Sequence, residues 1–203
     1  MKRPESKALI IFQKNLIKGT VKTRLAETMG EEAALEIYRK LVKHTHVQSS
    51  KVKADKLLFL SDQVSTQEKV GYAGYHCYVQ AEGDLGYRMK NAFDHSFAKG
   101  YKKTIIIGTD CAALTDSIIE DAYTLLDVND VVIGPAIDGG YYLIGMKKVI
   151  DGLFEDIPWS TDQVFALTVE KLKNNQLEYG CLPELPDVDS AADWESQKHL
   201  IGE

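Results

Sequence analysis

The chain has 203 residues and a formal net charge of −6, from 24 Lys and Arg residues against 30 Asp and Glu residues. This acidic balance argues against nucleic-acid binding driven by bulk charge, which usually needs a basic face. Hydrophobic residues make up 44% of the chain and charged residues 27%, as in an ordinary globular protein. We expect a single domain over residues 1–203, because a chain of this length buries one good core.

The sequence predicts neither a membrane span nor a secretory signal. No stretch approaches the roughly 20 apolar residues that cross a bilayer. The apolar run at residues 8–12 is shorter than a signal-peptide core of about 7–15 residues. Cys77, Cys111 and Cys181 are far apart in sequence and form no CxxC pair, so neither a zinc site nor a disulfide framework is indicated. We therefore expect a cytoplasmic protein.

The first half of the chain alternates apolar runs with helical patterns. The expected elements, in chain order, are a strand at residues 7–12, a basic segment at 13–25, an amphipathic helix at 31–45, strands at 56–60 and 75–80, and a helix between the turn at 82–86 and Gly100. Gly100 is expected just past the end of that helix, where glycine is common.

The second half repeats this alternation. The expected elements are strands at residues 103–108, 130–136, 141–146 and 178–182, and helices at 117–126, from about 160 to 173, and after Ser190. Ser117 with Glu120, and Ser160 with Gln163, have the spacing of helix-capping boxes. Strands that alternate with helices predict an α/β fold, with a Rossmann-like, mostly parallel sheet and helices on both faces.

A basic segment directly follows the first predicted strand. At that place backbone amides and cations converge on anions in phosphate-binding loops. The segment matches neither a Walker A motif nor GxGxxG, and a merely solvated basic loop is the alternative interpretation. The candidate phosphate-binding residues of this segment, which also contains Lys18, are Lys14, Gly19, Lys22, Thr23 and Arg24.

Acidic residues are expected at the ends of the later strands. Asp110 follows an apolar run that ends in Gly108, and Asp187 and Asp189 lie two apart in a segment expected to be extended. Residues i and i+2 of an extended segment point to the same side, so both carboxylates can face one ion. Mg²⁺ and Mn²⁺ take one or two carboxylates together with substrate phosphates. Asp189 is alternatively a turn residue ahead of the helix after Ser190.

The Asp138-Gly139-Gly140 sequence is first of all a turn signal. Two successive glycines also allow a ligand to approach the backbone closely. We therefore keep both interpretations of Asp138, Gly139 and Gly140, as a tight turn and as part of a substrate site.

Five motifs together resemble a known family. FQKNLIKGTVKTRL, QAEGDLGYRM, IIIGTDCAAL, DVVIGPAIDGGYYLIG and PWSTDQV occur in this order between residues 8 and 194. They resemble a small bacterial family with the nucleotide-diphospho-sugar-transferase fold, whose members are described as GT-A-type glycosyltransferases and are sometimes linked to arsenosugar biosynthesis. The chain is more distantly similar to phospholactate guanylyltransferases.

The resemblance implies roles for particular residues. Lys14, Lys22 and Arg24 would hold phosphates, with Lys22 and Arg24 assisting the reaction. The residues implied near the base or sugar are Gln80, Gly83 and Asp84. The implied metal ligands for Mg²⁺ or Mn²⁺ are Asp110, Asp187 and Asp189, and Asp110 is also the implied catalytic acidic residue. One departure stands out, because the family loop usually continues after the aspartate as Ser or Cys, Pro, Asp, and here it is Cys111-Ala112-Ala113.

Three functions follow as alternatives. The leading one is a metal-dependent transferase that moves a glycosyl group from a nucleotide sugar to a small-molecule acceptor. The second is a nucleotidyltransferase that uses a nucleoside triphosphate and a small phosphorylated substrate. The third is a non-catalytic nucleotide-binding module. None of them involves nucleic acid or a membrane span.

Overall fold

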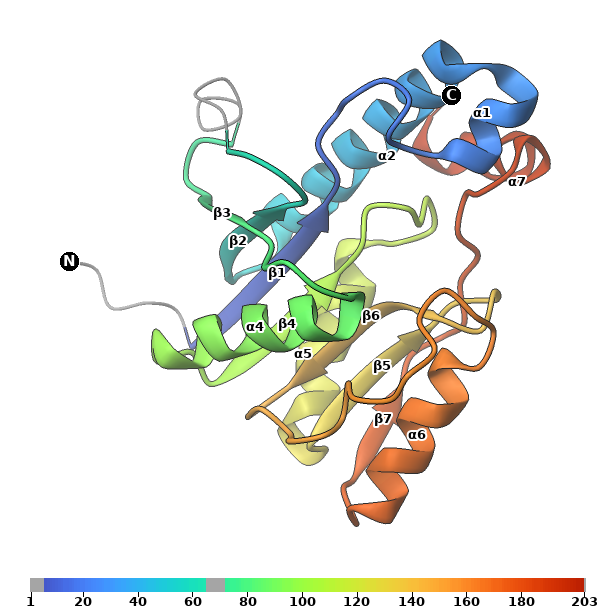
Figure 1. The fold of residues 1–203 in the computed structure, drawn as a ribbon. Helices are drawn as coiled ribbons and strands as arrows, with labels where there is room; N and C mark the ends of the chain where they lie inside the picture. Colours follow the sequence, from blue (N-terminus) through green and yellow to red (C-terminus); the bar gives the residue numbers. More distant parts are fainter. Residues whose placement is uncertain (1–5, 65–71, 203) are drawn as a thin grey trace.

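The computed structural model describes residues 6–64 and 72–202. One sheet of seven strands forms the centre of the molecule, in the order β3-β2-β1-β4-β6-β5-β7 (Figure 1). β6 runs antiparallel to its neighbours β4 and β5, and the other neighbouring strands are parallel. The strands are β1 (Lys7–Gln13), β2 (Asp55–Leu60), β3 (His76–Val79), β4 (Lys103–Ile107), β5 (Val131–Pro135), β6 (Tyr141–Met146) and β7 (Tyr179–Cys181).

Helices cover both faces of this sheet. Alternate residues of β1 point to opposite faces, so Leu9 and Ile11 join the core under α5, and Ala8 and Ile10 join the core under α4 and α6. The helices are α1 (Thr23–Met29), α2 (Glu31–Lys51), α4 (Leu85–Ala98), α5 (Asp116–Val128), α6 (Val164–Asn174) and α7 (Ala191–Gln197), followed by the 3₁₀ helix η1 (Lys198–Ile201). The expected α/β fold with a mostly parallel sheet is therefore confirmed.

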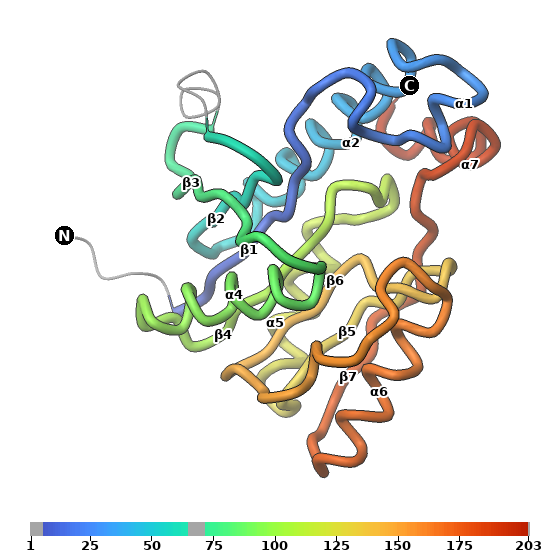
Figure 2. Tube along the Cα trace, in the orientation of Figure 1, coloured from blue at the N-terminus to red at the C-terminus, as the bar shows by residue number. Residues whose placement is uncertain are grey.

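The basic segment after β1 contains a helix that the sequence pattern did not predict. α1 is only seven residues long and buries Leu25 against α2 and α7. Figure 2 shows the C-terminal segment beside this region, although the two are far apart in sequence. A helix this short is stabilised by packing rather than by its own propensity, which is why periodicity missed it.

The predicted cap of α5 is wrong. The helix starts at Asp116, and the Thr115 side chain, not that of Ser117, accepts from the backbone N–H of Ile118. Glu120 does not complete a capping box, because its carboxylate accepts from Lys7 Nζ and from the backbone N–H of Lys53. Tertiary contacts thus override the local pattern.

The predicted cap of α6 is also wrong. α6 starts at Val164, and Gln163 occupies the N-cap position without a side-chain capping bond. Ser160 instead has a left-handed backbone (φ 66°). The carbonyl of Gly139 accepts from Phe165 N–H at 2.8 Å, so the turn at 138–140 supplies part of the capping. By contrast, the Ser190 cap of α7 is confirmed, with Asp193 completing a capping box.

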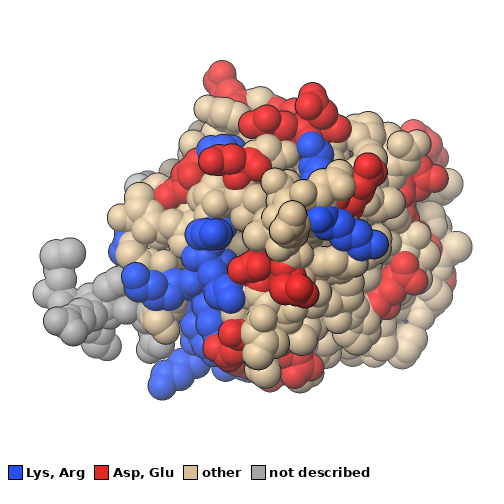
Figure 3. Space-filling model, turned by 90° about the horizontal axis from the view of Figure 1, so that it is seen from below, with Lys and Arg blue, Asp and Glu red and all other residues tan. Residues whose placement is uncertain are grey.

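None of the helices in the described ranges 6–64 and 72–202 is long and apolar enough to cross a membrane. On the face drawn in Figure 3, Lys and Arg side chains form a patch bordered by Asp and Glu side chains. Charges of both signs therefore occur on that face.

Candidate functional site

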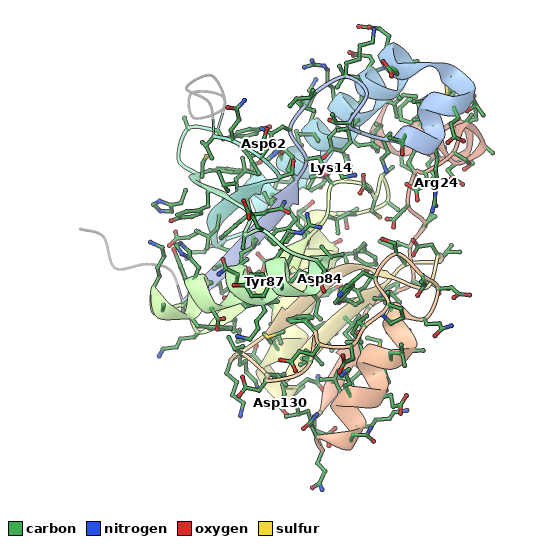
Figure 4. All side chains as sticks on the ribbon, viewed as in Figure 1. Lys14, Arg24, Asp62, Asp84, Tyr87 and Asp130 are labelled. Carbon is green, nitrogen blue, oxygen red and sulfur yellow. The ribbon has the colours of Figure 1, made fainter. Side chains whose placement is uncertain are left out.

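The candidate site lies at the carboxyl ends of the parallel strands, and we call this side of the sheet the rim. Lys14 follows β1 and Asp84 precedes α4 on this side, whereas Asp130, just before β5, lies at the amino ends of the strands (Figure 4). Ligands of open α/β sheets bind outside the carboxyl ends of the strands. The rim is therefore the place to ask which predicted residues meet.

A buried tyrosine ties two loops of the rim together. The hydroxyl of Tyr38, on α2, accepts from the backbone N–H of Lys14 at 3.0 Å and lies 2.9 Å from the Thr109 hydroxyl. Burial raises the pKa of Tyr38 well above its ordinary value, and the nearby Asp110 carboxylate raises it further. The hydroxyl therefore stays protonated and holds the segment after β1 against the loop that carries Asp110.

The loop of Asp110 is joined to the late acidic segment through the backbone. Val188 donates its N–H to the carbonyl of Asp110 at 3.0 Å. The Val188 side chain is fully buried in a cluster with Ala112 and Trp194. Ala112 thus serves as a core residue. Asp187 and Asp189 flank Val188 and are carried to the same side of the rim as Asp110.

Lys22 has the most unusual environment at the rim. Its side chain is only 6% exposed, and its ammonium lies 2.7 Å from Asp110 Oδ1 and 3.1 Å from Asp189 Oδ1. Burial alone lowers the pKa of Lys22, but the carboxylates of Asp110 and Asp189 outweigh burial and raise it above the ordinary value. Lys22 is therefore charged, and it bridges two carboxylates from distant parts of the chain.

The other residues of the basic segment are spread out. The Arg24 guanidinium is 76% exposed and lies 3.6 Å from Asp189 Oδ2, and Lys14 is exposed at the start of the segment. Lys18 points elsewhere, because its ammonium pairs with Glu32 at 2.7 Å. Gly19 has φ +79° and lies against the Glu31 side chain. Exposed Thr23 is the first residue of α1.

Asp187 experiences an excess of negative charge. Burial, together with the carboxylates of Asp110, Asp138 and Asp189, raises its pKa to about 7, although Lys22 opposes the shift. The structure thus brings together the four acidic residues that the sequence predicts at strand ends or in the turns after them. Within the described residues, this group of four carboxylates has Lys22 and Arg24 as its ion-paired cations.

The turn at 138–140 is built mainly by protein contacts. Asp138 Oδ1 accepts from Gly140 N–H at 2.9 Å. Gly139 has φ +88°, and a Cβ atom there would collide with the backbone of Asp162. Glycine is therefore needed at position 139 because the segment that leads into α6 packs directly against its backbone, and not because a ligand does.

Gln80, Gly83 and Asp84 are likewise occupied by protein contacts. Gln80 is 9% exposed, donates to the Phe59 carbonyl and accepts from Arg88. The Asp84 side chain caps α4 by accepting from Tyr87 N–H at 2.8 Å. Gly83 has φ +123° and lies against the Tyr87 ring. These contacts build the start of α4 and leave the predicted base or sugar contacts of the three residues as predictions.

The family of the chain follows from a direct comparison. A family model described as "Uncharacterized protein conserved in bacteria (DUF2064)" matches residues 45–161. The chain belongs to this family. A comparison with curated proteins finds no match.

Solved structures share the fold of this DUF2064 chain. A protein described as a "putative nucleotide-diphospho-sugar transferase" from Desulfovibrio desulfuricans G20 is 28% identical, with 97% of each chain covered and a TM-score of 0.86. The inositol-1-phosphate CTP transferase from T. maritima is 13% identical, with 98% of this chain and 96% of that chain covered and a TM-score of 0.64. CMP:2-keto-3-deoxy-manno-octonic acid synthetase, in complex with CTP, is 12% identical, with 97% and 98% covered and a TM-score of 0.61. The resemblance inferred from the five motifs is therefore confirmed at the level of family and fold.

The carboxylates can be tested for a metal. Among the described residues, no group of three or more His, Cys, Asp or Glu side chains is arranged to hold a metal ion. Asp110 and Asp189 nevertheless both contact one ammonium group, so they can face one cation. Because Mg²⁺ is usually held by one or two carboxylates plus substrate phosphates and waters, this pair fits a metal that arrives with a phosphate ligand.

Sequence reasoning missed two residues that organise the site. Tyr38 lies within the predicted helix at residues 31–45 without any assigned role, and Val188 is not singled out between the two aspartates. Both act through buried contacts between segments distant in sequence, for which a single sequence carries no signal.

Proposed function

We propose that this chain is a divalent-metal-dependent transferase that binds a nucleotide sugar at the rim and transfers its glycosyl group to a small acceptor. The observation that carries the proposal is the buried Lys22 ammonium between Asp110 and Asp189. A cation held by two carboxylates at the carboxyl ends of the strands supports a place where metal and phosphate charges meet. The Desulfovibrio protein named for nucleotide-diphospho-sugar transfer supports the substrate class.

The cations of the basic segment can receive a phosphate chain. Lys18 pairs with Glu32 and Lys22 pairs with two carboxylates, whereas Lys14 and Arg24 are exposed cations at the rim, with Arg24 also 3.6 Å from Asp189. These charges suit a diphosphate or a triphosphate, so the choice of a diphosphate donor rests on the Desulfovibrio protein. When bound, Mg²⁺ or Mn²⁺ would neutralise the nucleoside diphosphate that leaves, and Lys22 and Arg24 would stabilise the same charge.

Nucleotidyl transfer is the second candidate. It is supported by the shared fold with the two transferases described above, whose names include CTP or CMP. In that case the donor would be a nucleoside triphosphate and the acceptor a small phosphorylated molecule.

Thermal unfolding with a panel of ligands separates these candidates. A ligand that binds only the folded state raises the midpoint of unfolding. Under the proposal, one or more nucleoside diphosphate sugars raise the midpoint in the presence of Mn²⁺, and EDTA removes the shift. A shift with triphosphates alone would replace glycosyl transfer by nucleotidyl transfer. If no nucleotide or nucleotide sugar shifts the midpoint, the proposed function is wrong.

A further inference from the structure

Lys22 combines a rare backbone conformation with a buried charge. Its φ of 48° and ψ of 50° lie in the left-handed region, which non-glycine residues seldom occupy. A conformation of this kind persists only where the surroundings enforce it, and such residues cluster at functional sites. Here it starts α1 and directs the side chain inward, so that only 6% of the side chain is exposed.

The two carboxylates that contact the ammonium are partly exposed to solvent. Asp110 is 48% exposed and Asp189 is 42% exposed, although the ammonium that they share is buried. Their position is fixed by the backbone bond from Val188 to Asp110 and by the burial of Val188. A ligand in solvent can therefore reach the two carboxylates that the lysine contacts.

An ammonium group and a divalent ion compete for these oxygens. Mg²⁺ binds oxygens at about 2.0–2.1 Å, and the Lys22 nitrogen already lies 2.7 Å from Asp110 Oδ1 and 3.1 Å from Asp189 Oδ1. Two cations placed close together in a partly buried site repel each other strongly. A divalent ion that bridges the same two oxygens therefore displaces the ammonium from its place between them.

We propose that Lys22 is a built-in counter-cation that occupies the divalent-metal position between Asp110 and Asp189 and leaves it when a phosphate-bearing ligand arrives to accept its ammonium. The metal alone then binds weakly, because the displaced ammonium would have no anionic partner. The phosphate ligand supplies that partner, so metal and phosphate each strengthen the binding of the other. This inference rests on the metal and phosphate ligands of the proposed function.

Manganese binding without nucleotide tests the inference directly. Free Mn²⁺ is measured by electron paramagnetic resonance during titration of the wild type, Lys22→Met and Lys18→Met. Lys18→Met is the matched control, because it removes the same charge from the same segment but from a lysine paired with Glu32. We expect Lys22→Met to bind Mn²⁺ about tenfold or more tightly than Lys18→Met, since only the former removes the competing ammonium. Lys22→Gln serves as a second variant in case Lys22→Met fails to fold.

Two further measurements test where the ion binds and whether metal binding and phosphate binding are coupled. Asp110→Asn added to Lys22→Met is expected to cancel the gain, because it removes one of the two carboxylates. The ratio of affinities for Mn²⁺-pyrophosphate and for Mn²⁺ alone is expected to be about tenfold or more higher in the wild type than in Lys22→Met.

The possible outcomes separate the inference from the proposed function. Equal Mn²⁺ affinity in Lys22→Met and Lys18→Met, or no Mn²⁺ binding by any variant, overturns the inference. Tighter Mn²⁺ binding by Lys22→Met, combined with no thermal shift by any nucleotide, supports the inference and removes the nucleotide assignment.

Discussion

The two halves of the rim use polar residues in opposite ways. The charged half, at the ends of β4, β5 and β7, consists of Asp110, Asp138, Asp187 and Asp189 together with Lys22 from the segment after β1. The amide half, at the ends of β1 and β3, consists of the buried residues Gln13, Asn15 and Gln80. The residues of the charged half and Gln80 of the amide half are candidate site residues from the sequence, whereas Gln13 and Asn15 are not.

The amide half is held by neutral hydrogen bonds. Asn15 Nδ2 donates to the Gln63 carbonyl at 2.9 Å, and its Oδ1 accepts from Asp62 N–H at 2.9 Å. Gln13 bonds to Tyr72 and His46, and Gln80 bonds to Phe59 and Arg88. Amides can satisfy buried donors and acceptors without the desolvation cost of a charge.

The charged half has an excess of negative charge, which the stability of the fold does not require. Four carboxylates lie close together, two of them contact the buried Lys22 ammonium, and the pKa of Asp187 rises to about 7 by burial and by its acidic neighbours. A buried ion pair is weak evidence for stability, because desolvation offsets its attraction, and perturbed carboxyl groups cluster at functional sites. From this contrast we expect ligands to bind at the charged half and the amide half to serve as scaffold.

The largest expected effect is the loss of turnover in Asp110→Asn. With the donor identified by thermal unfolding, we expect the rate to fall by about 10²–10³, the usual effect of removing one group that stabilises transition-state charge. Steady-state kinetics measures the fall, and circular dichroism checks that the variant folds.

The matched control for Asp110 is Asp94→Asn, on the exposed face of α4. It changes the net charge equally and removes an i,i+4 ion pair with Lys90, so we expect turnover to stay within about twofold. Equal losses in both variants would mean that the loss in Asp110→Asn reflects net charge and not its place at the rim. A wild type that binds nucleotides without turning over any of them would favour the non-catalytic module.

A smaller effect is expected on stability in the amide half. Asn15→Ala removes the side-chain bonds to Ser61, Asp62 and Gln63, and we expect unfolding free energy to fall by about 2 kcal/mol. Asn91→Ala, on the exposed face of α4, is the control and should change stability by less than about 0.5 kcal/mol. Urea unfolding measures both. A stable Asn15→Ala variant with strongly reduced turnover would mean that the amide half belongs to the functional site and is not only a scaffold.

The convergence of the charged half could be predicted from the sequence, for a simple physical reason. Strands of a parallel sheet end at one edge, so Asp110, Asp138 and Asp189 had to approach each other once the strands were recognised. The confirmed strands at β1, β2 and β4 are buried apolar runs, whose pattern depends only on local sequence.

The contacts that decide roles could not be predicted in this way. The caps of α5 and α6, the inward turn of Lys22 and the capping role of Asp84 each depend on partners distant in sequence or on one backbone angle. Lys18 and Lys22 have the same side chain in the same segment, yet one lies outside against Glu32 and the other is buried. The sequence pattern does not distinguish the two lysines, and only their tertiary contacts do.

The smallest expected effect is a pH dependence in the amide half. Burial lowers the pKa of His46, which bonds to Gln13, to about 4. As pH falls from 7 to 5, the unfolded chain takes up a proton at this histidine and the folded chain does not, so stability falls. We expect His46→Gln to remove about 1–2 kcal/mol of that loss, as measured by urea unfolding at both pH values. His76→Gln, at an exposed position of β3, should keep the wild-type pH dependence. If His46→Gln keeps it too, the neutral histidine is not part of what holds the amide half together.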